Sequence, residues 1–424
     1  MFTHFDSAWS LSDRIFDLVD RSAWTKKGIV LRHPILFYVG HLPAFAYNQW
    51  RAAHGAEPFE PRFDTLFARG IDPEDEVEAA GLAPETWPDI SAILEYRDNI
   101  RTFLREHVQG DDAAAQTMQG LILEHELMHH ETLLYLVAQM EPAVLTAPER
   151  WAEVTLGSGR DAEPIEVASG SVRLGVEHGD IPFGWDNEFP SQTVDVPAFT
   201  IDDVPVTIER FAAFVEDGGY DRSDLWDAAD LRWLRRTGRT HPQFWRRSGA
   251  GWQVRSLFAW HEREDVAGWP VHVSYAEALA YARWIGRRLP TEGELHRATF
   301  TTPDGEERPF AWGNEAVGPE HGSIAYQRHA RVPVGQTPDA VSAWGVHDLV
   351  GNSWEWTSTP FLPRPGFEPI HPTYPGYSAD FFDGRHQVVF GASWATDPRF
   401  VRRSFRNWYG RRYPYVFATF RTVA

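Results

Sequence analysis

The 424-residue chain contains no cysteine. This absence excludes disulfide bonds, cysteine-bound zinc, iron–sulfur clusters and a thiol nucleophile. No apolar run approaches the roughly 18 residues that a membrane-spanning helix needs. The opening residues, MFTHFD, also lack the basic segment and apolar core of a signal peptide. We therefore expect a cytoplasmic protein with no membrane partner.

Basic residues are scarce as well. The 40 Lys and Arg stand against 60 Asp and Glu, which gives a formal net charge of −20. Phosphate groups would be repelled, so nucleic acid is not an expected partner. With 43% hydrophobic and 24% charged residues, the composition is that of a globular protein. The length predicts two or three domains.

The first third of the chain does contain helical periodicity. Apolar residues recur at spacings of three and four in segments that predict a bundle of four long helices. These segments cover residues 5–20, 31–45, 87–108 and 112–140. Asp111 and Asp112 are candidate N-caps of the last helix, and Pro142 stops it. Pro43 is expected to bend or interrupt the second helix just after His41.

The pattern changes beyond residue 142. Pro, Ala, Gly and Ser accumulate in residues 143–166, which predicts a linker. Residues 167–424 contain short strand-like segments, helical segments at 207–217 and 275–285, and many of the 19 tryptophans. The expected fold class is α+β, with a helical domain at 1–142 and a mixed, loop-rich domain held together by large aromatic side chains.

The fourth helical segment carries His125-Glu126-Leu127-Met128-His129. Residues four apart lie on the same face of a helix, so His125 and His129 are placed to bind one metal ion. His130 is rotated by about 100° and is a poorer partner. His41 is the candidate third ligand, because an unpaired polar group in its apolar, aromatic segment would be unfavourable. Three neutral imidazoles suit iron(II), copper or zinc, and their spacing does not choose among these metals.

The same five residues match the zinc-protease pattern, in which Glu126 would be the general base. A zinc-dependent hydrolase is therefore an alternative, although no compact motif beyond the linker supplies its third ligand. A binding module without catalysis and a purely structural role for the histidines are further alternatives.

Several motifs, taken in order, resemble those of the non-heme iron sulfoxide synthases of the ergothioneine and ovothiol pathways and their relative, selenoneine synthase. The segments His33–His41 and His125–His129 resemble those that supply the iron ligands on a DinB-like four-helix bundle. The second domain resembles the formylglycine-generating-enzyme fold, which is C-type-lectin-like. Its matching motifs are WDNEFP at 185–190, GRRLPTEGEL at 286–295, GNSWEWT at 351–357 and FRNW at 405–408. Formylglycine formation itself requires active-site cysteines, which this chain lacks.

The resemblance implies a function. The expected reaction is iron(II)- and O₂-dependent formation of a C–S or C–Se bond at the imidazole carbon of hercynine, with a thiol or selenol donor. The implied site residues are the metal ligands His41, His125 and His129, the catalytic Tyr377, and the substrate contacts Asn407, Trp408, Met128 and Tyr374. Tyr374 is also the runner-up for the role of Tyr377 as proton or electron donor. A structural calcium ion in the second domain is a further candidate.

Two departures from the family pattern concern the substrates. Met128 stands where ergothioneine-type enzymes often place a glutamine that touches the imidazole, and Tyr409 stands where they often place an aspartate. Of the arginines that bind a γ-glutamylcysteine donor, only Arg97 offers a partial match. We therefore expect a donor without the glutamyl group, such as cysteine or a selenosugar.

Overall fold

The computed structural model describes residues 2–70, 73, 79, 86–148, 151, 153–324, 326 and 329–424. The chain forms two compact units. The first comprises Met1–Pro148 with two short returns of the chain, Pro182–Gly184 and His371–Pro375. The second comprises Glu149–Ile181, Trp185–Ile370 and Gly376–Ala424. Residues 149, 150 and 152 of the predicted linker lie outside the described residues.

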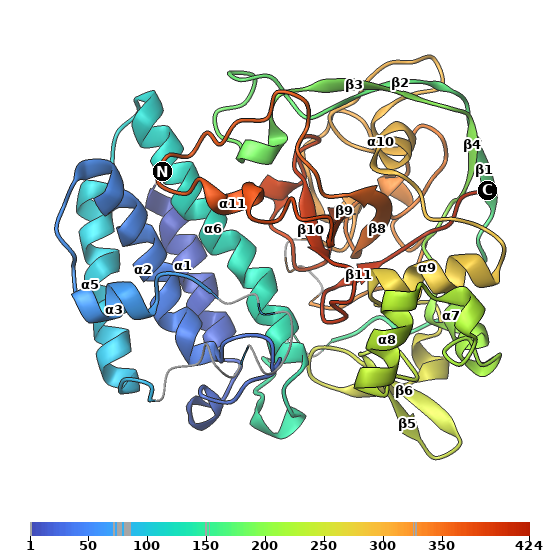
Figure 1. The fold of residues 1–424 in the computed structure, drawn as a ribbon, viewed down its shortest axis with the longest axis horizontal. Coiled ribbons are helices and arrows are strands. Elements are labelled where there is room, and N and C mark those ends of the chain that lie inside the picture. The colour runs from blue at the N-terminus through green and yellow to red at the C-terminus, as the bar shows by residue number, and fades with distance from the viewer. Residues whose placement is uncertain are drawn as a thin grey trace. The chain divides into compact units, whose positions relative to one another are not determined.

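The regular elements that the structure describes in the first unit are helices (Figure 1). α2 packs against α3, α5 and α6, and α1 packs against α6. The helices are α1 (Phe2–Phe16), α2 (Ile35–His54), α3 (Pro61–Leu66), α5 (Ile90–His107) and α6 (Ala113–Ala138). The four long ones agree with the predicted segments. The short α3 was not predicted, because a single turn and a half carries no periodicity. None of the described helices is long and apolar enough to cross a membrane.

α2 continues through Pro43, and the predicted interruption after His41 is therefore wrong. Proline removes one backbone donor and crowds the preceding turn, which disfavours a helix interior. Here the helix is buried along most of its length, from Ile35 to Tyr47 without a break. The tertiary packing of that apolar surface outweighs the local penalty.

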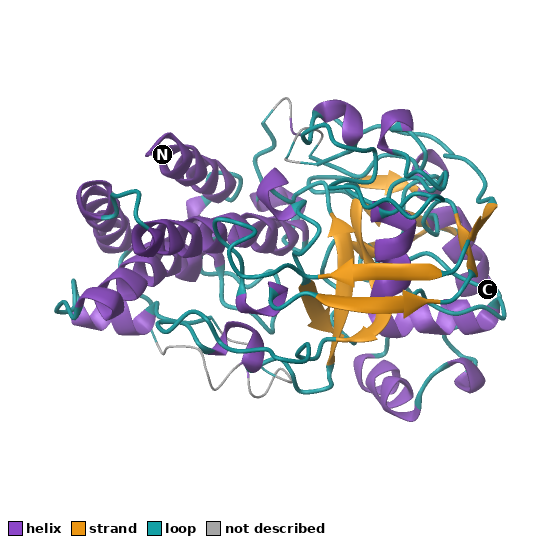
Figure 2. Cartoon of the chain, turned by 90° about the horizontal axis from the view of Figure 1, so that it is seen from above, coloured by secondary structure: helices purple, strands orange, loops and turns teal. Residues whose placement is uncertain are grey.

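The second unit contains all the strands that the structure describes (Figure 2). The largest sheet has the order β10-β9-β8-β11, antiparallel except for the parallel pair β8 and β11. Its strands are β8 (Ser353–Pro360), β9 (His386–Ala392), β10 (Asn407–Gly410) and β11 (Ala418–Thr419). The smaller sheets pair β1 (Pro164–Val167) with β4 (Phe199–Asp202), β2 (Gly170–Leu174) with β3 (Gln192–Val196), and β5 (Trp245–Ser248) with β6 (Gly251–Arg255) and β7 (Trp260–Glu262).

Short helices and tryptophans complete this unit. The helices are α7 (Ile208–Glu216), α8 (Ala228–Thr237), α9 (Tyr275–Trp284), α10 (Glu292–Phe300) and α11 (Gly376–Ala379). Trp269 and Trp356 are fully buried, and their indole N–H groups donate to Thr155 O at 2.7 Å and Val273 O at 2.8 Å. Each tryptophan thus fills apolar space while it fastens a loop, as expected for a strand-poor fold.

Candidate metal centre

The two histidines of α6 face the same side of the helix. Asp112 begins the helix, because its side chain accepts a hydrogen bond from Ala115 N at 2.9 Å. A leucine-rich run follows and is buried. Its packing stabilises the helix, which ends at Ala138. The ring centroids of His125 and His129 lie 4.5 Å apart, in keeping with their i, i+4 spacing.

α2 supplies the third imidazole. The ring of His41 lies 5.2 Å from that of His125 and 5.0 Å from that of His129. One nitrogen from each of the three rings lies within 4.8 Å of the other two. Within the described ranges, no other set of His, Cys, Asp or Glu side chains has this geometry. The structure therefore brings together the three histidines that the sequence singled out.

A backbone carbonyl orients His41. Its Nδ1 lies 2.7 Å from Phe67 O, at the end of α3. A carbonyl oxygen can only accept, so Nδ1 carries the proton and donates. Nε2 then keeps the lone pair that a metal ion requires, an arrangement typical of metal-binding histidines.

Burial keeps these imidazoles neutral. Desolvation lowers the pKa of His41 to about 4. Desolvation, together with the neighbouring histidines, also lowers the pKa of His125 and of His129 well below the usual value. The neutral ring is the form that binds metals. Nδ1 of His129 is moreover buried without a hydrogen-bond partner. The residues present therefore fit a three-histidine metal site.

Aromatic rings enclose the histidines. Phe45, one turn after His41, stacks on His125 with centroids 3.4 Å apart and planes inclined by 5°. Tyr374 meets Phe45 edge-on at 5.2 Å, and Tyr38 lies 5.6 Å from His129. Tyr374, predicted as a substrate contact, thus lies one ring away from a predicted metal ligand.

The two returns of the chain explain how Tyr374 reaches this place. Phe183 rests on α6 at Gly120, where a Cβ would lie 2.3 Å from its ring. The ring of Phe183 lies 5.4 Å from that of His371, and Nε2 of His371 lies 3.1 Å from Gly184 O. The segment that carries Tyr374 is therefore tied to the segment that rests on α6.

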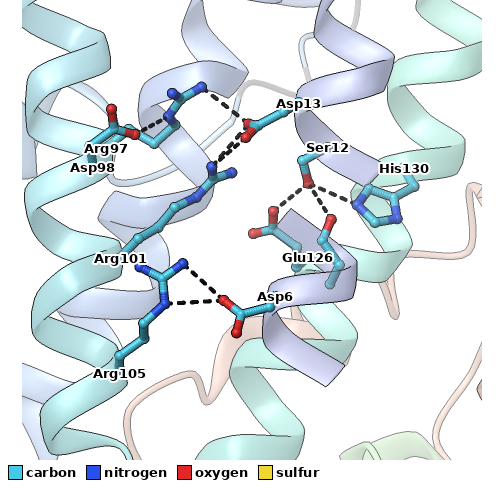
Figure 3. Close-up of polar contacts among 10 residues, drawn as sticks. Asp6, Ser12, Asp13, Arg97, Asp98, Arg101, Arg105, Glu126 and His130 are labelled. Carbon is cyan, nitrogen blue, oxygen red and sulfur yellow. Dashed lines mark hydrogen bonds and ion pairs between the residues drawn. The ribbon is translucent and has the colours of Figure 1, made fainter. Parts of the chain in front are cut away.

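A second polar pair, Glu126 and His130, lies about 100° around α6 from the two histidines, and Figure 3 shows it. The buried hydroxyl of Ser12 on α1 bonds the carboxylate of Glu126, and it lies 2.8 Å from Nε2 of His130. Ser12 also donates to Ala8 O at 3.2 Å. This arrangement engages the carboxylate of Glu126 with α1. His130 is a structural partner of Ser12, consistent with its rotation from the metal-binding face.

Ion pairs join α1 to α5 next to this cluster (Figure 3). Asp13 accepts from Arg97 at 3.1 Å and from Arg101 at 2.8 Å. Arg97 also bonds the neighbouring Asp98 at 2.9 Å. The arginine that the family resemblance suggested for donor binding is thus engaged in ion pairs within the first unit. Met128 lies half-buried on α6, between the two ligand histidines.

The second unit holds the other predicted site residues. Tyr377 stacks on Trp185 at 3.9 Å and meets Trp408 edge-on at 5.3 Å. The next residue, Ser378, bonds the carboxylate of Asp186 and accepts from Asn187 Nδ2 at 2.9 Å. The motif Trp185-Asp186-Asn187 therefore fixes the short helix α11 that carries Tyr377.

Asn407 and Trp408 begin strand β10 and are half-buried. One face of the Trp408 indole is covered by Phe361, with centroids 4.1 Å apart and planes inclined by 7°. The Asn407 side chain accepts from Trp408 N at 2.8 Å. The pair therefore offers an amide N–H₂ group and an indole edge or second face to a ligand.

Known proteins are similar to this chain in sequence. The family model described as Sulfatase-modifying factor enzyme 1-like domain matches residues 157–424. A protein of Mycobacterium tuberculosis named hercynine oxygenase is 40% identical over 291 residues, which cover 68% of this chain and 67% of that protein. Ergothioneine biosynthesis protein 1 of Neurospora crassa is 28% identical over 99% of this chain and 57% of its own length.

The chain belongs to the ergothioneine-type sulfoxide synthase family. The resemblance stated from the motifs is thereby confirmed, as is the formylglycine-generating-enzyme-like domain. A formylglycine-generating enzyme of Mycobacterium tuberculosis is also similar, at 31% identity over 49% of this chain and 77% of that protein. The match to the domain family begins at residue 157, so the DinB-like character of the helical unit stays a prediction.

Sequence reasoning missed the residues that hold the synthase's histidines in place. Ser12 and Phe67 act through a hydroxyl and a backbone carbonyl, and neither group has a sequence pattern of its own. Two glycines inside the predicted helices, Gly40 and Gly120, were the sequence signal that other segments pack closely there. Glycine inside an apolar helix is unfavourable and therefore marks a close approach.

Proposed function

We propose that this sulfoxide synthase forms a C–S or C–Se bond at the imidazole carbon of hercynine, with iron(II) and O₂. The observation that carries the proposal is the convergence of His41, His125 and His129 within 4.8 Å. The names of its relatives, hercynine oxygenase and ergothioneine biosynthesis protein 1, support the substrate and an oxygen-dependent step.

Under this proposal His41, His125 and His129 would hold iron(II) through neutral ring nitrogens. The chemistry that iron(II) supplies at such a site is the activation of O₂ beside the bound substrates. When a thiol is the donor, the product is a sulfoxide. One oxygen atom goes to sulfur, and the other leaves as water with the hydrogens of the imidazole C–H and the thiol. The ring of Phe45, which stacks on His125 and meets Tyr374 edge-on, covers one face of the His125 ring.

The other side chains have binding and proton-transfer roles in this proposal. Asn407 and Trp408 contact hercynine, whose trimethylammonium group suits an indole face. Tyr377, buried between aromatic rings, supplies the proton or electron, and Tyr374 contacts substrate. Met128 cannot donate a hydrogen bond to the imidazole ring of hercynine. Other contacts must therefore hold that ring.

The proposal is tested by incubating the full chain aerobically with iron(II) and hercynine, and with cysteine, γ-glutamylcysteine and a selenosugar in competition. We expect hercynine to be consumed, with cysteine or the selenosugar preferred over γ-glutamylcysteine. Mass spectrometry of the products identifies the atom bonded to the imidazole. Absence of hercynine consumption with every donor would reject the proposal, and peptidase activity with bound zinc would favour the hydrolase instead.

The two tyrosines are separated by a pair of conservative variants. Tyr377→Phe keeps the ring stacked on Trp185 and removes the hydroxyl, so we expect kcat to fall by about 10²-fold or more with KM little changed. Tyr374→Phe is expected to raise KM, because its predicted role is substrate contact. Steady-state kinetics with hercynine measures both. The reverse pattern would assign proton or electron transfer to Tyr374, whose ring adjoins Phe45 beside His125.

A further inference from the structure

Gly40, directly before His41 on α2, has no room for a side chain. A Cβ there would lie 2.6 Å from Cδ2 and Cε2 of Phe67 and 2.7 Å from its Cγ. Carbon atoms in contact normally lie about 3.5–4.0 Å apart. Glycine in a helix interior is also about 1 kcal/mol less favourable than alanine. The propensity of α2 therefore disfavours Gly40, and the ring of Phe67 occupies the space that it leaves.

Phe67 is the same residue whose carbonyl orients His41. Its side chain is fully buried, with ring centroids 6.0 Å from Phe37 and 5.7 Å from Phe63. Its oxygen lies 2.7 Å from Nδ1 of His41. Because the ring and the carbonyl belong to one residue, the position of the ring against Gly40 determines where the oxygen lies.

The helix that ends at Phe67 is anchored on two sides. Asp64 is buried and accepts from Tyr96 OH of α5 at 2.6 Å and from Phe59 N at 2.7 Å. Asn48 Nδ2 of α2 donates to Asp64 O at 3.0 Å. α3 lies beside α2 (Figure 1). The short α3 is thus a fixed support, and Gly40 leaves the space in which Phe67, directly after α3, meets α2.

We propose that Gly40 is a positioning residue of the metal centre, because its missing side chain admits Phe67 and so fixes the hydrogen bond that orients His41. The inference rests on the proposed metal centre, and it does not depend on the substrate. Without the bond from Nδ1 to Phe67 O, the ring of His41 could turn and take either tautomer. Outer-sphere partners of this kind hold a ligand in the orientation and protonation state that the metal needs.

Titration of the full chain with Co(II), followed by its visible absorption, tests the proposal without any turnover. Gly40→Ala is expected to raise the Kd for Co(II) by about 10- to 100-fold, the range observed for outer-sphere partners of metal ligands. We also expect its absorption bands to shift, because the His41 ring changes orientation. Gly219→Ala is the matched control in the second unit, where a Cβ would lie 2.1 Å from the ring of Phe214. That control is expected to lower thermal stability and leave the Kd unchanged.

A second-site variant separates this mechanism from a general loss of helix stability. Phe67→Ala removes Cγ, Cδ2 and Cε2, the atoms that a Cβ at residue 40 would strike, and keeps the backbone carbonyl. The double variant Gly40→Ala/Phe67→Ala is therefore expected to bind Co(II) more tightly than Gly40→Ala. Additive losses in the two single variants would contradict the proposal.

The remaining outcomes also decide the matter. An unchanged Kd in Gly40→Ala would overturn the inference while leaving the metal centre intact, whereas absence of Co(II) binding by the unaltered chain would overturn the centre itself. Should Gly40→Ala fail to fold, Tyr96→Phe carries the test, because it removes the bond that ties Asp64 and α3 to α5 without altering α2. A raised Kd in that variant supports the inference, and an unchanged one contradicts it.

Discussion

Replacing His41 with alanine is expected to abolish hercynine consumption and to weaken metal binding more than any outer-sphere change. Only His125 and His129 of α6 would remain as protein ligands. The loss of affinity should therefore exceed the roughly 10- to 100-fold typical of outer-sphere partners. Fe(II) content after dialysis and a Co(II) titration measure the loss of metal binding, and product formation with excess iron(II) measures the loss of hercynine consumption.

His130→Ala is the matched control for this experiment. His130 adjoins a predicted ligand in sequence and is fully buried, yet it bonds Ser12 on α1. Its removal should lower the midpoint of thermal unfolding, because it leaves part of a buried polar cluster unpaired. The affinity for Co(II) should stay close to that of the unaltered chain. Equal losses of affinity in the two variants would contradict the assignment of His41 as a ligand.

The sequence was sufficient to predict the long elements of the fold. α1, α2, α5 and α6 follow from periodic apolar residues over several turns, and α6 begins at the cap residue expected for it. The uninterrupted course of α2 through Pro43 could not be foreseen, because the burial that stabilises it depends on tertiary packing. The same holds for the two short returns of the chain, since three to five residues carry no pattern.

The convergence of the three histidines was predictable from the sequence, and their surroundings were less so. Helical spacing paired His125 with His129, and an apolar setting marked His41. The partners that orient them act through a carbonyl at Phe67 and a hydroxyl at Ser12, whose positions depend on how α1 and α3 pack. Tyr374 reached the first unit through the return at 371–375, which only the three-dimensional contacts disclose.

The helix α6 shows why an HExxH pattern does not determine a chemistry. Its two i, i+4 pairs, His125 with His129 and Glu126 with His130, are offset by one residue and so by about 100° around the axis. The first pair meets α2 and the second meets Ser12 of α1. An HExxH hydrolase has the same offset between its first histidine and its glutamate, so the offset alone does not assign a chemistry. The neighbour that each face meets therefore decides the role of each pair.

Replacing Arg421 with methionine is expected to destabilise the second unit more than any surface change. The side chains of Arg421 and Glu355 are both fully buried and form two hydrogen bonds of 2.6 and 2.7 Å. Arg421 also donates to the carbonyls of Asp202 at 3.1 Å, Asp203 at 3.0 Å and His347 at 2.9 Å. Removing one partner of such a pair leaves an uncompensated buried charge, which destabilises by about 3–5 kcal/mol. Chemical denaturation monitored by tryptophan fluorescence measures this loss.

The pH dependence identifies the buried carboxylate as its cause. Burial raises the pKa of Glu355, and Arg421 opposes that rise. In Arg421→Met the opposition is gone, so the folded state should hold a proton on Glu355 that the unfolded state releases. Stability then falls as pH rises, and the loss relative to the unaltered chain should be smaller at pH 5 than at pH 8. Arg222→Met, which breaks an exposed pair with Asp224, should show little change at either pH. A loss in Arg421→Met that is the same at both pH values would mean that the lost carbonyl contacts, rather than the charge on Glu355, account for it.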